Sequence, residues 1–429
     1  MKGNFQIIIL IIFIAAAIFG VLVFSGAIPL GSGGEGSLGT VVLWGTIPAQ
    51  AIAAPLEDFN NANPTFTVNY VQKSVDTFDR DLLEALASGK GPDMFFLPDN
   101  LAFSYANKIF TIPYGSYPLS TFKNVFAGAG EVFLTGKGIL AFPMSIDPLM
   151  LYYNRSILDA NGVIYPPSTW EDMSNLVPVL TKKDDSNRIL KSAVALGHFS
   201  NIVHAKDILV ALFMQAGNPI IKEENGVFIS TLNRPIGNYN LPSILKFYTD
   251  FADPNNPAYS WNRSFSGSGD AFSKEDLAFY FGYAGEFRSL VNKNPNQNFF
   301  IAEMPQIKNS NFKLTGARVT GLAISSFSKN FNTAFTAASL MATGDFAHKF
   351  ATATGVAPAR RDLLAIIPAD AYSPIFYRSA LYARSWPDPS SKNTDNIFGT
   401  MVNAVLSNTL STTDAIRDAS SKMSLLLFK

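Results

Sequence analysis

Few side chains in this sequence have the type and spacing that enzymes use for acid–base or nucleophilic chemistry. Two adjacent acidic pairs, Glu223-Glu224 and Asp184-Asp185, offer the carboxylates that a glycosidase would need, but both lie in polar stretches typical of solvated turns. The chain has no cysteine and only 3 histidines. It also lacks the sequence patterns of serine hydrolases, zinc proteases and P-loop enzymes. We therefore predict a binding protein rather than an enzyme, with no cofactor and no metal site; an exported glycosidase is the alternative.

Two polar segments follow predicted strands at the place where α/β proteins hold their ligands. Residues 40–97 alternate between short apolar strands and helices in the order strand, helix, strand, helix, strand. This order implies a parallel sheet covered by helices. Ligands of such sheets lie beyond the carboxyl ends of the strands. The rule nominates Trp44 and Thr46 after the first strand and Asp99 after the third.

A second α/β block begins near Pro148, and helices are appended to it. A lone histidine, His204, falls inside one predicted helix, where we expect a packed or surface residue rather than a ligand contact. The predicted elements are a strand at 149–153, a helix opened by a capping box at Ser168–Glu171, an amphipathic helix at 201–215, helix-rich segments at 238–251 and 273–281, strands at 298–304 and 320–324, a helix at 332–341, a polar loop at 387–394 and a mostly helical tail at 395–427.

The N-terminal residues 1–30 predict a membrane anchor. No charged residue occurs from Phe5 to Leu30, and about 20 apolar residues suffice for a helix to cross a bilayer. Lys2 precedes the segment and Glu35 follows it, which favours an N-in single pass with everything after residue 30 outside the cytoplasm. A small-residue site at 25–27 leaves a cleaved, secreted form open. Residues 31–39 predict a Gly/Ser-rich tether.

The overall charge balance excludes one class of partner. Lys plus Arg and Asp plus Glu number 33 each, so no net field attracts nucleic acid, and no basic cluster occurs along the chain. We therefore expect no nucleic-acid partner.

An ordered series of short motifs resembles the bacterial extracellular solute-binding proteins of family 1, the sugar-type, maltose-binding-protein-like substrate-binding proteins of ABC transporters. The resemblance covers nearly all of the chain after the tether, and it departs from many relatives in lacking a lipid-modified cysteine. The motifs are WGT at 44–46, FNNANP at 59–64, ASGKGPD at 87–93, FPMSID at 142–147, LYYN at 151–154, ANGV at 160–163, PSTWE at 167–171, FGY at 281–283, GLAIS at 321–325 and GVAPAR at 355–360.

The resemblance implies a two-lobed α/β fold of the periplasmic-binding-protein type II class, each lobe a mostly parallel sheet flanked by helices. Matching the motifs predicts an N-terminal lobe of 40–146 plus 302–353 and a C-terminal lobe of 147–301 plus 354–429. Strands would cross between the lobes near Ile146, Ile301 and Thr354. It also implies a small-molecule ligand enclosed by hinged closure of the lobes and delivery of that ligand to the permease subunits of an ABC importer.

A carbohydrate is the ligand that the candidate side chains suit best. Sugars have apolar faces that aromatic rings cover and hydroxyls that acids, amides and Arg bind. Amines, nucleosides and phosphate-bearing metabolites are the alternatives, because rings also stack on these. For Glu286 and Arg318, a surface ion pair is the alternative to contact with a ligand. The predicted contacts are Trp44, Tyr283 and Trp386 for stacking, Asp99, Asp147, Glu286 and Arg318 for polar contacts, and Thr46 and Ser145 as smaller polar groups.

Overall fold

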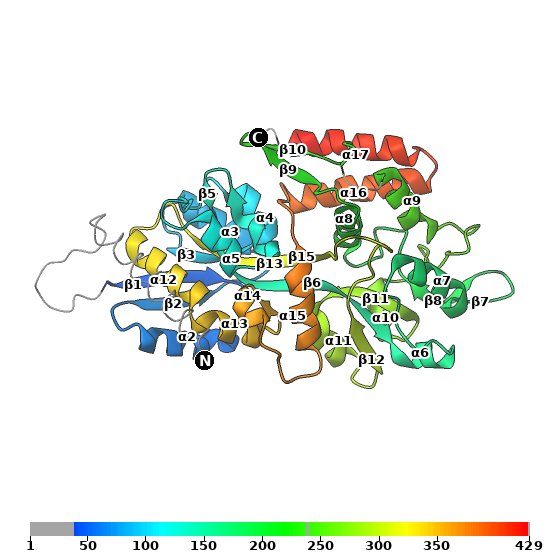
Figure 1. Cartoon of the computed structure of the whole chain (residues 1–429), viewed down its shortest axis with the longest axis horizontal. Helices are drawn as coiled ribbons and strands as arrows, with labels where there is room; N and C mark the ends of the chain where they lie inside the picture. The colour runs from blue at the N-terminus through cyan, green and yellow to red at the C-terminus, as the bar shows by residue number, and fades with distance from the viewer. Residues whose placement is uncertain (1–37, 237–239, 428–429) are drawn as a thin grey trace, which may run out of the picture.

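The computed structural model describes residues 38–236 and 240–427 and arranges them as two α/β lobes joined by long strands (Figure 1). The predicted anchor at 1–30 lies outside the described residues, as does most of the predicted tether at 31–39. Within the described ranges, no helix is both long and apolar enough to cross a membrane.

The first lobe begins with the predicted alternation of strands and helices. The strands β1, β2 and β3 pair in parallel, with β1 between the other two. This pairing confirms the parallel sheet that we predicted from apolar strands alternating with helices. The elements of this lobe are β1 (Thr40–Gly45), α2 (Ala49–Ala62), β2 (Thr67–Gln72), α3 (Phe78–Ala87), β3 (Met94–Pro98), α4 (Asp99–Tyr105), α5 (Leu119–Val125), η1 (Gly128–Phe133), β4 (Leu134–Thr135), β5 (Gly138–Ile139), α12 (Phe331–Thr343) and α13 (Asp345–Thr354).

The second lobe holds most of the remaining helices (Figure 1). Its two C-terminal helices pack against each other, and the last one also packs against β10 of the hairpin formed by β9 and β10. Its elements are α6 (Arg155–Ala160), α7 (Trp170–Leu180), β7 (Lys182–Lys183), β8 (Ile189–Val194), α8 (Ala205–Gln215), β9 (Ile221–Glu224), β10 (Val227–Ser230), α9 (Leu241–Asp250), α10 (Ser268–Ser273), β11 (Leu277–Tyr283), η2 (Ala284–Glu286), α11 (Phe287–Lys293), β12 (Phe299–Ala302), α16 (Ser391–Leu406) and α17 (Thr412–Leu427).

One long strand, β6 (Ala141–Asn154), connects the sheets of both lobes. Its first part, from Ala141 to Pro148, pairs with β13 (Thr315–Ile324), and its second part pairs with β11 and β12. Near the middle of the molecule lie β14 (Ala357–Pro358), α14 (Arg361–Leu364), α15 (Ser373–Tyr382) and β15 (Ala383–Arg384). The exact lobe boundaries predicted from the motifs remain a proposal.

Because β6 is shared, strands from both lobes form one 11-stranded sheet in which β2, β1, β3, β13, β6, β11, β8 and β7 follow one another, whereas β4 with β5 and β9 with β10 form separate two-stranded sheets. The prediction of a mostly parallel sheet in each lobe is wrong for the second lobe. There β8 and β11 are parallel, but β11 and β12 both run antiparallel to β6. The reason is that β6 runs directly from the first lobe into the second. Parallel pairing of consecutive strands would instead need a crossover connection such as a helix.

Two other local predictions are corrected by the structure. The segment 273–281, expected to be helix-rich, contains most of strand β11, whose seven residues are all buried. A continuous apolar run of this kind suits a strand covered on both faces, and periodicity alone does not separate it from a buried helix. The capping box before α7 is formed one residue later than predicted, by Thr169 and Asp172.

The predicted amphipathic helix at 201–215 is shorter and more buried than expected. Helix α8 begins at Ala205, directly after His204, and ten of its eleven residues are buried. A helix that is apolar on most sides lies inside a protein rather than on its surface. In the tail, α16 begins at Ser391, inside the predicted loop at 387–394.

We predict that Gly321→Ala destabilises the shared sheet, because a Cβ at Gly321 would lie 2.7 Å from the Cβ of Ala141 and 2.7 Å from the ring of Phe133. Overpacking of this kind costs about 1–3 kcal/mol, which lowers the midpoint of thermal unfolding. Gly316→Ala on the same strand is the control, because its Cβ would find its nearest neighbour, the Cβ of Ala211, at 3.5 Å. Equal midpoints for the two variants would contradict this account of the packing.

Candidate ligand-binding site

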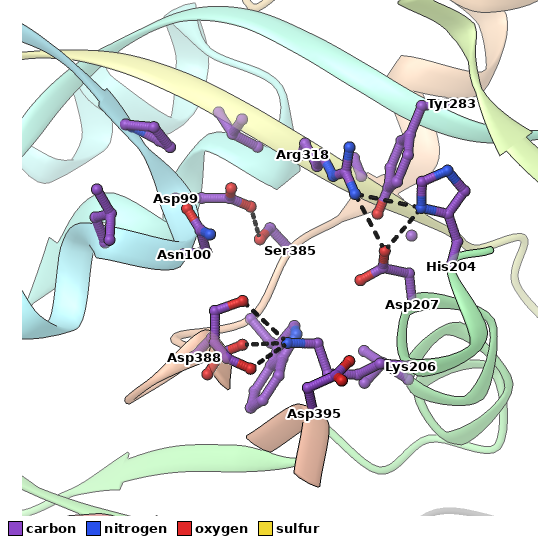
Figure 2. Close-up of a pocket in the computed structure, with 18 of the residues that line it drawn as sticks. Asp99, Asn100, His204, Lys206, Asp207, Tyr283, Arg318, Ser385, Asp388 and Asp395 are labelled. Atoms are coloured by element: carbon purple, nitrogen blue, oxygen red, sulfur yellow. Dashed lines mark hydrogen bonds and ion pairs between the residues drawn. The ribbon is translucent and has the colours of Figure 1, made fainter. Parts of the chain in front are cut away.

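A cavity of about 1280 Å³ lies where the two lobes and their shared strands meet. Figure 2 shows side chains from both lobes facing one another across it, with Asp99 on one side, His204 and Asp207 on the other, and Arg318 between them. The cavity is larger than the roughly 300–1,000 Å³ of a typical small-molecule pocket. It therefore has room for a ligand of several rings.

The structure brings seven of the nine predicted residues to this cavity. Trp44 is not among the lining residues; the ammonium of Lys73 lies over its ring, 3.6 Å from the centroid. Glu286 also does not line the cavity but holds residues that do. The seven lining residues are Thr46, Asp99, Ser145, Asp147, Tyr283, Arg318 and Trp386.

Asp147 and Arg318 are placed by the pairing of β6 with β13. The two residues are direct cross-strand partners, so their side chains leave the sheet on the same face. Almost all of β6 is buried, whereas Asp147 is partly exposed to the cavity. The sheet register thus brings an acid and a base together at the junction of the lobes.

The carboxylate of Asp147 is partly desolvated. The N–H of Gly285 donates to its Oδ1 at 2.9 Å. Burial raises the pKa of Asp147 to about 7, although the Gly285 hydrogen bond and the charge of Arg318 act in the opposite direction. Near neutral pH this group is therefore able both to donate and to accept a hydrogen bond.

Asp99 lies at the start of α4, directly after β3, as the strand-end rule predicted. It is 7% exposed, and its Oδ2 accepts a hydrogen bond from the hydroxyl of Ser385, which follows β15. Burial raises the pKa of Asp99 to about 6, against the effect of the Ser385 hydrogen bond. The contact ties the first lobe to a segment that follows the shared strands.

Arg318 points into the cavity from β13 and lies over the ring of Tyr283, with its guanidinium carbon 3.9 Å from the ring centroid. Its Nη2 is 3.5 Å from Asp207 Oδ2 and 3.3 Å from His204 Nδ1. The Arg318 side chain is still 54% exposed, which leaves N–H groups for a ligand. Tyr283 itself is 3% exposed and Arg318 lies over its ring, so little of the ring is open to the cavity, and stacking of Tyr283 on a ligand stays a prediction.

Trp386 also offers little ring surface. It is 8% exposed, and its ring packs edge-on against Phe398 at 6.4 Å between centroids. The predicted residues that line the cavity therefore present mainly polar groups and little aromatic ring surface.

His204 and Asp207 were missed by sequence reasoning, although both line the cavity. His204 Nε2 lies 2.6 Å from Glu286 Oε1, and Glu286 also accepts hydrogen bonds from the hydroxyl of Tyr280 and the N–H of Tyr283. Glu286 thus supports the site from behind and does not pair with Arg318 on the surface. His204 and Glu286 lie 82 positions apart in the chain, so no local pattern could join them.

A buried ion pair also lies at the wall of the cavity. Lys206 Nζ lies 3.0 Å from Asp388 Oδ2 and 3.2 Å from Thr394 Oγ1, and both charged residues are less than a tenth exposed. The pair joins α8 to the start of α16 (Figure 2). Removing one partner of such a pair leaves a buried uncompensated charge, which costs about 3–5 kcal/mol.

We predict that Asp147→Asn stabilises the protein in a pH-dependent way. The carboxyl ionises near pH 3.8 in the unfolded chain and near 7 in the folded one. Between these values the folded state keeps a proton that the unfolded state has lost, so wild-type stability falls as the pH rises. The advantage of the variant should be smallest at pH 4, grow up to about pH 7 and stay constant above it.

Thermal unfolding midpoints from pH 4 to pH 8 measure this difference. Asp185→Asn, in an exposed turn, is the control and should not reproduce the pH-dependent gain. A difference between Asp147→Asn and wild type that does not vary with pH would contradict the predicted shift.

Similarity to proteins of known structure agrees with this two-lobed architecture. A cyclo/maltodextrin-binding protein complexed with maltotetraose has a TM-score of 0.73 at 17% identity, with 92% of this chain and 98% of that chain covered. The sugar-binding protein MalE of Xanthomonas citri has a TM-score of 0.71 at 16% identity, with 91% and 97% covered. An ABC transporter solute-binding protein of Thermotoga lettingae, bound with α-D-tagatose, has a TM-score of 0.65 at 21% identity, with 90% and 99% covered.

At these identities the structural similarity shows the fold alone. Comparison with curated protein sequences finds no match. The sequence model of the bacterial extracellular solute-binding proteins matches residues 54–374. Since that match spans well over half of the chain, the protein belongs to the family of bacterial extracellular solute-binding proteins.

Proposed function

We propose that this protein captures a carbohydrate outside the cytoplasm and delivers it, chemically unchanged, to an ABC importer. The observation that carries the proposal is the large cavity between the lobes, lined by carboxylates, an arginine and hydroxyl groups. The family consists of binding proteins, and its name places them outside the cell. No catalytic step is part of the proposal.

The polar groups around the cavity suit the hydroxyls of a sugar. Asp99 and Asp147 supply carboxyl oxygens from two different elements, and Arg318 supplies N–H donors. Ser145 and Thr46 add hydroxyls that both donate and accept. A polyhydroxylated ligand would satisfy such a mixed set of donors and acceptors better than an apolar ligand does. The structurally similar proteins bound to maltotetraose and to α-D-tagatose support this choice.

We further propose that the ligand is enclosed by hinged closure of the lobes. The hairpin β9–β10 of the second lobe reaches the first lobe (Figure 1). The N–H of Gly136, in the turn between β4 and β5, donates to Glu223 Oε2 at 3.1 Å. The ring of Phe228 meets Phe103 of α4 edge-on at 5.2 Å between centroids. These contacts would stabilise a closed form.

They also give Glu223 a role that differs from catalysis. This residue belongs to one of the acidic pairs considered for a glycosidase, and its carboxylate instead accepts a hydrogen bond from the opposite lobe.

The proposal has three further parts: delivery to permease subunits, attachment through residues 1–30 and exposure of residues after 30 outside the cytoplasm. They follow from the family and the sequence rather than from the cavity.

Thermal shift with a panel of ligands tests the carbohydrate assignment. Maltotetraose, maltotriose and α-D-tagatose represent sugars, and spermidine, adenosine and glucose 6-phosphate represent the alternatives. A sugar at one hundred times its Kd should stabilise the protein by about 2.7 kcal/mol, and Asp99→Asn should reduce that shift. Asp58→Asn, on the exposed side of α2, should leave it unchanged. Shifts with the other compounds and none with any sugar would reject the carbohydrate.

We predict that Phe228→Ala weakens closure, because it removes the ring contact with Phe103 across the lobes. Such a contact is worth about 1 kcal/mol, so dissociation of a sugar identified in the panel should accelerate roughly fivefold. Val227→Ala on the same hairpin is the matched control, because Val227 is 53% exposed. Stopped-flow dissociation and fluorescence transfer between labels on the two lobes measure the effect. Identical kinetics for both variants would argue against a closing role for the hairpin.

A further inference from the structure

His204 occupies an uncommon backbone position at the edge of the cavity. Its φ is +61°, in the left-handed region, directly before the first residue of α8. Among residues with a side chain, Asn, Asp and His adopt this conformation most readily. The imidazole is thereby fixed at a point where several elements of the fold converge.

The two ring nitrogens of His204 face different partners. Nε2 lies 2.6 Å from Glu286 Oε1, on η2. Nδ1 faces two groups at once, Arg318 Nη2 at 3.3 Å on β13 and Asp207 Oδ2 at 3.5 Å on α8. Figure 2 shows His204, Asp207 and Arg318 meeting at the cavity. Nδ1 therefore lies between Arg318, which can only donate, and the carboxylate of Asp207, which can only accept.

Each protonation state of His204 allows only one of the two contacts of Nδ1, the one with Arg318 or the one with Asp207. In neutral His204, Nε2–H donates to Glu286 and the lone pair of Nδ1 accepts from the N–H of Arg318. In protonated His204 both nitrogens are donors, so Nδ1–H donates to Asp207 and no longer accepts from Arg318. Protonation also places a second positive charge next to the guanidinium. The hydrogen bond to Arg318 is therefore lost when His204 gains a proton.

We propose that His204 is a positioning residue, which fixes the Arg318 guanidinium in the ligand cavity through a proton-dependent hydrogen bond. The role in ligand binding rests on the proposed function, whereas the hydrogen bond itself does not. A guanidinium held in place loses less conformational freedom when it binds a ligand. Affinity should therefore be highest when His204 is neutral.

The groups around His204 determine its pKa and hence the pH at which its hydrogen bond to Arg318 is lost. Burial opposes protonation of the ring, but hydrogen bonds to Asp207 and Glu286 outweigh it and raise the pKa of His204 above 6.5. The charged and titratable groups that face the ring are Glu286 from η2, Asp207 from α8, Arg318 from β13, Tyr283 from β11 and Asp147 from β6. Asp147 titrates near pH 7, so a test has to separate its effect from that of His204.

Two substitutions make that separation because both tolerate the left-handed backbone. His204→Asn places an amide oxygen near the position of Nδ1, where it accepts from Arg318 and cannot be protonated. His204→Gly removes the contact without adding strain. His348→Asn, on α13 of the first lobe, is the control. Asp147 is unchanged in all three variants, so a titration that it causes persists in each of them.

The deciding measurement is NMR of the full-length, ligand-free protein with 15N-labelled arginine and ring-labelled histidine side chains. With 3 histidines in the chain, His204 is assigned by its loss in the variants, and Arg318 by Arg318→Lys. We expect the Arg318 signals to shift with the same midpoint as the His204 ring in wild type and His348→Asn, and this shift to vanish in His204→Asn. Arg318 signals that do not follow His204, or that titrate equally in His204→Asn, would overturn the proposal.

A binding series with maltotetraose as probe, from pH 6 to pH 9, adds the functional consequence. Wild type should lose about tenfold in affinity as His204 becomes protonated, which corresponds to about 1.4 kcal/mol. Apart from a pH dependence caused by Asp147, which all variants share, His204→Asn should keep the affinity that wild type has at high pH, and His204→Gly should bind more weakly than His204→Asn at every pH. Absence of maltotetraose binding at all pH values would count against the carbohydrate assignment, whereas the spectra alone decide the positioning role.

Discussion

The register between β6 and β13 is the constraint on which the cavity depends. It makes Asp147 and Arg318 direct cross-strand partners at the point where one sheet serves both lobes. Since side chains alternate between the two faces of a strand, a slip of one residue in either strand would turn the group of that strand away from the cavity and separate the pair. The register is held by buried apolar neighbours of the pair, among them Ile146 and Val319, both at most 1% exposed.

Around this pair, the charges of the site are compensated from several directions. Asp207 and Tyr283 contact Arg318, and Glu286 contacts His204. Burying charges is costly unless they are paired and hydrogen-bonded. The cavity wall can therefore be polar without unfolding the lobes, because each buried charge that contacts it has a partner from another element.

The sequence predicted the parts of the molecule that depend on local patterns. Alternating apolar strands and helices located the first lobe, and the strand-end rule placed Thr46 and Asp99 at the cavity. The ordered motifs led to Asp147 and Tyr283, and Arg318 was nominated because its side-chain type suits sugar hydroxyls. Prediction failed where the outcome depends on distant segments. The apolar run of β11 resembles a buried helix until its pairing with β6 is known. Likewise, nothing near His204 in the chain indicates Glu286 as its partner.

Under the proposed hinged closure, the position of Asp147 and Arg318 on strands shared by both lobes would also order the events of capture. Points near a hinge move least when two bodies rotate about it, so a solute meets these two groups in nearly the same geometry before and after the rotation. The contacts of the β9–β10 hairpin with Gly136 and Phe103 of the first lobe would then form only as closure is completed. The time that a solute stays bound would accordingly depend on these hairpin contacts.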